Sequence, residues 1–330
     1  MENLKLSLIV PVYNRPNEIE ELLDSLSKQT DKDFEIVIVE DGSTITCTSQ
    51  IEKYKPIFDT KYFFKPNTGP GQSRNFGMER ASGNYFIILD SDCIIPSEYI
   101  ATVRKSLSEK YVDTFGGPDR ADKSFTNLQQ AVDYSMTSFF TTGGIRGGKK
   151  QLDKYYPRSF NMGISKEVFQ KTGGFPSVRY AASKAAGEDI ELSINIYKEG
   201  FKIGLISEAY VYHKRRTSIK QFYRQVYNFG YARVTLSRRN KGTLKLVHLL
   251  PLAFTLGTIG LIVLSVFVSW MFILPLLFFM LIVNIDAIIR KHSLLVGKLA
   301  MVISLIQLYG YGLGFIKGVW DAITGKKIGS

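Results

Sequence analysis

The sequence predicts an α/β fold: a doubly wound, mostly parallel sheet, followed by a juxtamembrane amphipathic helix and C-terminal transmembrane helices. Three observations support this prediction. Strand-like and helix-like segments alternate three times in about the first hundred residues, as expected of parallel strands joined by helices. Residues 202–245 contain eleven Lys or Arg and one acid, and residues 246–285 contain no Asp, Glu, Lys or Arg. The chain therefore divides into a globular part and a membrane part.

The globular part is expected to begin with three strand–helix pairs. The predicted strands are 4–12, 34–39 and 61–64, and the predicted helices are 17–29, 51–58 and one that ends at Ser82. Asn17 is a candidate N-cap of the first helix. A fourth strand at 85–89 is entirely apolar or aromatic, which is typical of a buried strand. Later strands are expected at 112–116, 160–164 and within 201–212, and later helices at 96–109, 166–171 and 187–199.

Acidic residues follow two of these strands at their carboxyl ends. Glu40 and Asp41 follow the second strand, and Asp90-Ser91-Asp92 follows the fourth. In open α/β sheets, ligands bind at this edge. Two neighbouring carboxylates repel each other unless a cation lies between them, and Mg²⁺ bound to substrate phosphates would supply one. An Asp-x-Asp alone is more often a polar turn, so the other motifs have to decide.

The chain is expected to have three regions: a globular domain at 1–213, a basic amphipathic region at 214–245 and a membrane region at 246–330. Segments at about 246–268 and 271–289 are long enough to cross a bilayer, at roughly 20 residues per crossing. A third apolar segment, about 299–316, is followed by lysines. A full crossing would place them outside, against the positive-inside rule, so spanning, re-entrant and interfacial placements all stay open.

Composition points to anionic partners. The formal net charge is +12 and the pI is about 9.4. The basic region also carries regularly spaced aromatic residues, a pattern that fits an anionic bilayer surface or a nucleic acid. The adjacent apolar segments favour lipid over nucleic acid. With only Cys47 and Cys93, no disulfide framework is implied, and the N-terminus does not resemble a signal peptide, so we expect a cytoplasmic first domain.

Five short motifs then occur in a characteristic order: Val10–Asn14, Glu40–Ser43, Gly71–Asn75, Asp90–Asp92 and Gly187–Asp189. Together with the strand–helix pattern, they resemble the family 2 glycosyltransferases of the GT-A fold, of the membrane-associated bacterial type. The resemblance covers about residues 4–213. It implies a nucleotide-sugar donor, preferably of UDP, with GDP or dTDP as alternatives, and a transfer that inverts the anomeric carbon.

The resemblance also implies roles for the residues at the donor side. Asp41 would hydrogen-bond the nucleobase, and Pro11 and Tyr13 would line it. Arg74 would lie near the base and the diphosphate, and Asp90 would face the ribose or the metal shell. Glu40 stands where the family more often has Asp, which leaves the choice of base open.

Further roles concern the metal and the acceptor. The resemblance implies that Asp92 ligates Mg²⁺ or Mn²⁺ and that His213 matches a further metal ligand of some members. A histidine that bonds backbone at a strand end is an equal alternative for His213. Asp189 would be the general base, and Glu188 would orient the acceptor or a loop.

A glycine-rich, basic segment at 141–150 is predicted to be a loop over the site. Its Arg146, Lys149 and Lys150 would suit a phosphate of the acceptor, although a plain connector would have a similar composition.

The sequence thus predicts a metal-dependent, inverting glycosyltransferase at the cytoplasmic face of the membrane, attached by several membrane segments. Its acceptor would be a lipid-linked or cell-surface glycan precursor. One alternative is transfer to polyprenyl phosphate itself. A non-catalytic membrane scaffold that keeps the fold is an alternative of another class, and the complete set of acids at 90, 92 and 189 argues against it.

Overall fold

The computed structural model describes residues 4–120, 122, 125–143, 155–177 and 187–325. The chain forms two compact units. The first, here called the sheet unit, comprises Met1–Asp122, Asp153–Val178 and Glu188–Lys214. The second, here called the helical unit, comprises Lys123–Leu152, Arg179–Gly187 and Arg215–Ser330. Each unit is described by itself.

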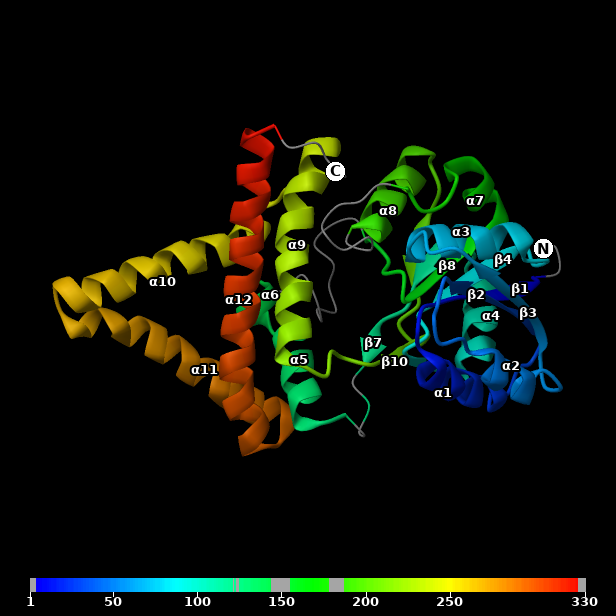
Figure 1. Cartoon of the computed structure of the whole chain (residues 1–330), viewed down its shortest axis with the longest axis horizontal. Helices are drawn as coiled ribbons and strands as arrows, with labels where there is room; N and C mark the ends of the chain where they lie inside the picture. The colour runs from blue at the N-terminus through cyan, green and yellow to red at the C-terminus, as the bar shows by residue number, and fades with distance from the viewer. Residues whose placement is uncertain (1–3, 121, 123–124, 144–154, 178–186, 326–330) are drawn as a thin grey trace. The chain divides into compact units, whose positions relative to one another are not determined.

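The sheet unit contains a seven-stranded sheet with the order β3-β2-β1-β4-β8-β6-β9 (Figure 1). Its strands are β1 (Leu6–Val12), β2 (Phe34–Asp41), β3 (Asp59–Lys65), β4 (Tyr85–Leu89), β6 (Thr114–Gly116), β8 (Asn161–Ser165) and β9 (Ile203–Leu205). The first four are parallel to one another, whereas β8 is antiparallel to both β4 and β6. The predicted mostly parallel sheet is confirmed.

Helices cover both faces of this sheet, which explains why its strands are apolar without alternation. The helices of the unit are α1 (Pro16–Ser27), α2 (Thr48–Tyr54), α3 (Pro70–Arg80), α4 (Tyr99–Glu109), α7 (Lys166–Thr172) and α8 (Glu188–Lys198). Leu8 and Val10 of β1 pack with Leu22 of α1 in one core. Ile9, on the opposite face of β1, packs with Met78 of α3 in a second core.

The sheet unit also contains a small second sheet of three strands. It consists of β5 (Cys93–Ile94), β10 (Val211–His213) and β7 (Asp119–Arg120), with β10 in the middle. The antiparallel pairing of β10 with β5 sets His213 opposite Cys93. Residues more than a hundred positions apart in the sequence therefore become neighbours.

Two local predictions differ from the structure. The first helix begins at Pro16, with Arg15 at the N-cap position, so Asn17 is not its cap. Proline suits the first helical position because its fixed φ matches a helix and its missing N–H would have no partner there. Glu40 and Asp41 belong to β2 itself rather than to the loop after it.

The helical unit contains the long apolar helices. Its elements are α5 (Asn127–Thr137), α6 (Phe139–Thr142), α9 (Ile219–Arg239), η1 (Leu246–Leu249), α10 (Leu250–Phe267), η2 (Trp270–Ile273), α11 (Leu274–Lys291) and α12 (Leu294–Ile323). Helix α5 was not predicted; it starts with a reciprocal cap between Thr126 and Gln129. Among the described residues, three helices are long and apolar enough to cross a membrane: Leu246–Phe267, Trp270–Lys291 and Leu294–Ile323. The third is longer at both ends than the predicted segment.

Helices α9 and α12 run side by side in the same direction (Figure 1). Their backbones approach so closely that a side chain at Gly230 of α9 would clash with the Tyr311 carbonyl oxygen of α12. A side chain at Gly314 would likewise clash with the Tyr227 carbonyl oxygen of α9. Small residues permit such close packing of long helices. The apolar side chains Phe222 and Val226 of α9 are buried in the core of this unit.

The α9–α12 contact leads to a first prediction. Gly314→Ala should push the two helices apart and lower the stability of the helical unit by about 1–3 kcal/mol, the usual cost of overpacking. Gly257→Ala in α10 is the matched control, because nothing lies within 4 Å of an added Cβ there. Thermal unfolding in detergent should show a lower midpoint for Gly314→Ala only. Equal midpoints for both variants would show that the close contact is absent.

Candidate active site

The predicted site residues gather at the carboxyl edge of the main sheet. Asp41 ends β2, Pro11 lies one residue before the end of β1, and Asp90 directly follows β4. These three strands are neighbours and parallel, so their ends meet at one edge. Tyr13 follows β1 with 52% of its surface exposed, available to a flat ligand.

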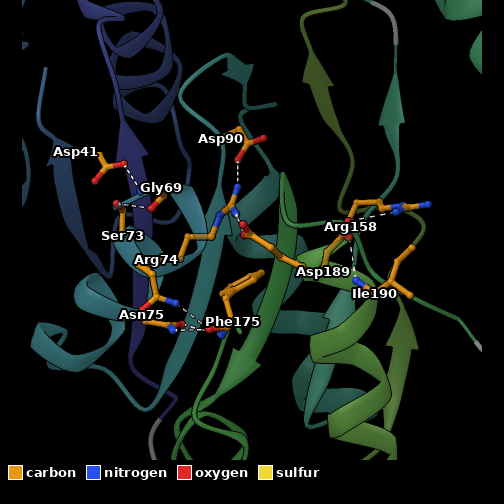
Figure 2. A network of polar contacts seen from close by, with 12 residues as sticks. Asp41, Gly69, Ser73, Arg74, Asn75, Asp90, Arg158, Phe175, Asp189 and Ile190 are labelled. Carbon is orange, nitrogen blue, oxygen red and sulfur yellow. Dashed lines mark hydrogen bonds and ion pairs between the residues drawn. The ribbon is translucent and has the colours of Figure 1, made fainter. Parts of the chain in front are cut away.

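Arg74 of α3 connects this edge to the start of α8. Its Nη2 donates to Asp90 Oδ1 over 2.7 Å (Figure 2). Its Nη1 lies 3.8 Å from Glu188 Oε2. The guanidinium also lies over the Phe175 ring, 5.1 Å from its centroid. Arg74 is only 4% exposed, so its charge depends on the facing Asp90 carboxylate for compensation.

The next residue of α3 fixes the helix to the segment that carries Phe175. Asn75 Nδ2 donates to the Phe175 carbonyl oxygen, and Asn75 Oδ1 accepts from the Phe175 N–H, each over 2.8 Å (Figure 2). Gln72 donates to the same carbonyl oxygen over 3.2 Å. The Gly71–Asn75 motif therefore has a structural role in addition to supplying Arg74: it holds Phe175 under the guanidinium.

Glu188 is the first residue of α8 and is buried. Burial raises the pKa of its carboxyl; Arg74 lowers it, and the nearby charges of Asp189 and Asp90 raise it, to about 8 in all. Among the described residues, no hydrogen-bond donor reaches Glu188 Oε2. A side chain at position 71 would clash with that oxygen, so Gly71 leaves room for it. The raised pKa favours the protonated form of Glu188 at neutral pH.

Asp189, the predicted base, follows directly. Its Oδ2 lies 3.3 Å from Arg158 Nη1, and its Oδ1 accepts from the Ile190 N–H over 2.9 Å (Figure 2). Its side chain is 13% exposed. Asp189 is thus paired with a cation, and a carboxylate within hydrogen-bond reach of a hydroxyl can act as its proton acceptor. Arg158 was not predicted, because it lies outside the motifs and before β8.

Asp92 lies between an imidazole and a guanidinium. His213 Nε2 is 3.1 Å from Asp92 Oδ1, and the Arg15 guanidinium forms an ion pair with Asp92 Oδ2. Burial alone would raise the pKa of Asp92, but His213 and Arg15 outweigh it and hold this pKa well below its usual range. Burial alone would lower the pKa of His213, and Asp92 raises it instead. The pairing of β10 with β5 creates this contact.

Asp92, Cys93 and His213 are spaced suitably for a metal ion, with one ligand atom of each within 4.8 Å of the others. One observation favours a fit. Asp92 Oδ1 is buried and lies 3.1 Å from His213 Nε2, but it makes no hydrogen bond of good geometry with any described residue. Mg²⁺ and Mn²⁺ prefer carboxylate oxygen and accept imidazole less readily. Burial and the charge of Asp92 raise the pKa of the Cys93 thiol, which makes Cys93 a poor ligand for either ion.

His213 stacks on Phe160, with ring centroids 4.7 Å apart. This contact fixes the plane of the imidazole against Asp92. Phe160 and Arg15 were not predicted either, because neither is close in sequence to the residue that it contacts.

Asp41 anchors the loop that leads into α3. It accepts hydrogen bonds from the N–H groups of Thr68 and Gly69, each over 2.9 Å, and pairs with Lys65. Gly69 has φ = +98°, a conformation that glycine adopts easily, so the loop can turn back toward Asp41.

Glu40 is fully buried and accepts hydrogen bonds from the Cys47 N–H over 3.0 Å and from the Ser43 hydroxyl. It therefore shapes the loop after β2. The remaining predicted residues, Arg146, Lys149 and Lys150, lie outside the described residues.

Comparison with known proteins gives a consistent assignment. The profile of glycosyl transferase family 2 matches residues 7–173, half of the chain. A β-1,3-glucosyltransferase of Campylobacter jejuni, named for its substrate GalNAc(5)-diNAcBac-PP-undecaprenol, is 34% identical over 198 residues, which are 59% of this chain and 60% of that protein. Glycosyltransferase GlyA of Streptococcus pneumoniae is 40% identical over 111 residues, 33% of this chain and 16% of its own length. For several uncharacterised Rickettsia glycosyltransferases, the matched part is only 13–18% of their length.

Solved structures show the same fold. The mannosyltransferase PcManGT of Pyrobaculum calidifontis, solved with GDP-Man and Mn²⁺, superposes with a TM-score of 0.65 at 17% identity, covering 97% of this chain and 88% of that one. Residues 1–349 of Staphylococcus aureus TarS, solved with UDP-GlcNAc, superpose with a TM-score of 0.52 at 21% identity, covering 98% of this chain and 92% of that one. Fold, motifs and profile agree, and the chain belongs to glycosyl transferase family 2.

Proposed function

We propose that this glycosyltransferase is metal-dependent and inverting, and that it moves a sugar from a nucleotide-sugar donor to a lipid-linked or cell-surface glycan precursor at the cytoplasmic face of the membrane. The observation that carries the proposal is Arg74, which contacts both Asp90 at the sheet edge and Glu188 beside Asp189. One buried cation thus connects the donor side to the acceptor side.

The donor side has to stabilise a leaving nucleoside diphosphate. Asp92 and His213, with Asp90 nearby, would hold a divalent ion, which neutralises the negative charge on the leaving group when bound. Arg74 adds a buried positive charge at the same edge. Pro11 and Tyr13 would line the base, and Asp41 would contact it while holding the loop at 67–69 in place. The two structural neighbours were solved with GDP-Man and UDP-GlcNAc, which are both nucleotide sugars.

The acceptor side needs one proton acceptor. The acceptor hydroxyl loses its proton as it attacks, and Asp189 would take that proton. Glu188 cannot take this role at neutral pH, because its raised pKa keeps it protonated. An inverting transfer needs one such base, whereas a retaining mechanism of the glycosidase type requires a second carboxylate as nucleophile. The glucosyltransferase of Campylobacter jejuni supports a lipid-linked acceptor by its name.

A panel of nucleotide sugars, each incubated with and without Mn²⁺, tests the activity. We expect Mn²⁺-dependent release of nucleoside diphosphate from one donor class, UDP sugars first. Analysis of the labelled product then separates an extended lipid-linked glycan from a sugar–phosphate–lipid. If Mn²⁺ released no nucleoside diphosphate from any donor, the proposal would be wrong.

The role of Asp189 gives a second prediction. Asp189→Asn should lower kcat by roughly 10²–10⁴-fold, the range of a lost general base, with a small effect on the KM for the donor. Glu199→Gln, an exposed acid just after the same helix, is the matched control and should keep the parent kcat. A rise in the KM for the donor at unchanged kcat would contradict the assignment of Asp189 as the base.

Glu188 gives a pH-dependent prediction. Between pH 4.5 and about 8, the folded protein keeps a proton on Glu188 that the unfolded chain has released. Glu188 therefore makes folding stability fall as pH rises through this window. Glu188→Gln keeps a neutral side chain of the same shape and removes this contribution. The unfolding midpoint in detergent should fall less between pH 5 and 8 in the variant than in the parent. Parallel curves for the two proteins would contradict the assignment of a protonated Glu188.

A further inference from the structure

The three long apolar helices of the helical unit form a triangle, not a bundle. Helices α10 and α11 meet at the turn around Ser269 and diverge from it, and α12 crosses their open end (Figure 1). At one corner, Thr255 of α10 packs against Gly312 and lies 3.5 Å from the Leu308 carbonyl oxygen. At another corner, Gly297 of α12 packs against Asn284 and Ile288 of α11.

The lengths of the sides exclude three parallel crossings. Gly297 and Gly312 are 15 residues apart, which is about 22 Å along a helix at about 1.5 Å per residue. The other two sides of the triangle, here called the legs, are the parts of α10 and α11 between the turn and their contacts with α12. The legs have lengths similar to that of the α12 side. Helices that cross a bilayer tilt by only about 20° on average. Two sides of such a triangle can cross a bilayer at moderate tilt, but the third must then lie along its plane.

Exposure and charge indicate which side lies in the plane. In the most apolar 18-residue stretch of each helix, protein buries 11% of the residues in α10 and in α11, but 50% of those in α12. Leu256, Val266, Phe278 and Leu281 are among the many exposed apolar side chains of the two legs. Residues 246–285 include no Asp, Glu, Lys or Arg. The legs therefore have the surface and composition of helices surrounded by lipid.

Helix α12 has a neighbour that cannot enter hydrocarbon. Glycines 310, 314 and 318 of α12 pack against α9 along its length. Helix α9 carries five basic residues: Lys220, Arg224, Arg233, Arg238 and Arg239. If α12 crossed the bilayer, α9 would have to follow it with these charges. Away from the glycines, α12 exposes an apolar stripe that suits an interface: Leu295, Val302, Leu313, Ile316, Trp320 and Ile323.

A polar network lies at the open end of the triangle, away from the turn. Asp133 of α5 pairs with Lys291 at the end of α11 over 2.6 Å, and with Arg215 over 2.8 Å. Tyr134 of α5 donates to Asp286 of α11 over 2.8 Å. Charged groups thus mark the open end as the water-facing side of the unit.

We propose that α10 and α11 form a helical hairpin inserted into an anionic bilayer from one side, and that α12, with α9 packed against it, lies in the interface on that same side without crossing. Lys298 and Lys317 of α12 are then on the same side as Arg290 and Lys291, which satisfies the positive-inside rule. The partner of this surface is the lipid bilayer. The inference is independent of the proposed transfer reaction.

Cysteine accessibility tests the proposal with the full chain in the membrane of a bacterial host. Lys298→Cys and Thr324→Cys place thiols at exposed positions near the two ends of α12, and Lys241→Cys places a reference thiol just after α9. The parent chain sets the background, because Cys47 and Cys93 are buried. A membrane-impermeant maleimide is applied to inverted vesicles and to spheroplasts. All three thiols should react from the same side. Reaction of Lys298→Cys and Thr324→Cys from opposite sides would overturn the proposal.

Depth is tested with a matched pair of tryptophans. The two native tryptophans are changed to phenylalanine, and either Leu281→Trp in α11 or Leu313→Trp in α12 is added, both at exposed positions. In vesicles of anionic lipid, lipids brominated near the chain end should quench the residue at 281 most strongly. Lipids brominated near the headgroup should quench the residue at 313 most strongly. Deep quenching at both positions would show α12 inside the hydrocarbon and contradict the proposal.

Discussion

The buried charge of Arg74 is the constraint on which the rest of the site depends. A guanidinium that is 4% exposed is stable only if a carboxylate faces it, and Asp90 supplies that carboxylate over 2.7 Å. Glu188, from a distant element, lies 3.8 Å from the same guanidinium. Several features serve this arrangement. Gly71 leaves space for Glu188, and Asn75 holds Phe175 under the guanidinium. Because Asp189 follows Glu188 directly, the same contact also determines where the proposed base lies.

A second charge cluster has a buried anion at its centre, whereas the first has the cation of Arg74. Asp92 is a buried carboxylate that is neutralised by His213 and Arg15. A divalent ion held by Asp92 and His213 would take over the neutralisation from Arg15, whose guanidinium would then be free to face a diphosphate. The two clusters lie at the carboxyl edge of the same sheet, one on each side of Asp90, whose Oδ1 contacts Arg74 and whose Oδ2 lies 4.0 Å from His213. Asp90 is thus the link between the proposed donor and base positions.

Local patterns in the sequence predicted most of the fold, and they located the acids at the carboxyl edge of the sheet. The strand at 85–89 and the acids after it are contiguous, so periodicity and position locate them together. Arg15, Arg158 and Phe160 were missed, because their roles arise only from contacts with residues far away in the sequence, such as Arg15 with Asp92. The glycines of α12 are a similar case. Their spacing is visible in the sequence, but only the structure shows that they let α9 pack closely against α12. Tertiary pairing, such as that of β5 with β10, decides these cases.

The central claim is that Asp92 and its neighbours form a seat for a metal-bound diphosphate. Calorimetric titration with UDP and GDP, each with and without Mn²⁺, tests it most directly in the parent, in Asp92→Asn and in Asp24→Asn, whose side chain is 51% exposed in α1. We expect Mn²⁺ to strengthen binding of one nucleotide in the parent and in Asp24→Asn, and to have no such effect in Asp92→Asn. An equal effect of Mn²⁺ in all three proteins, or no binding of either nucleotide to the parent, would contradict the account.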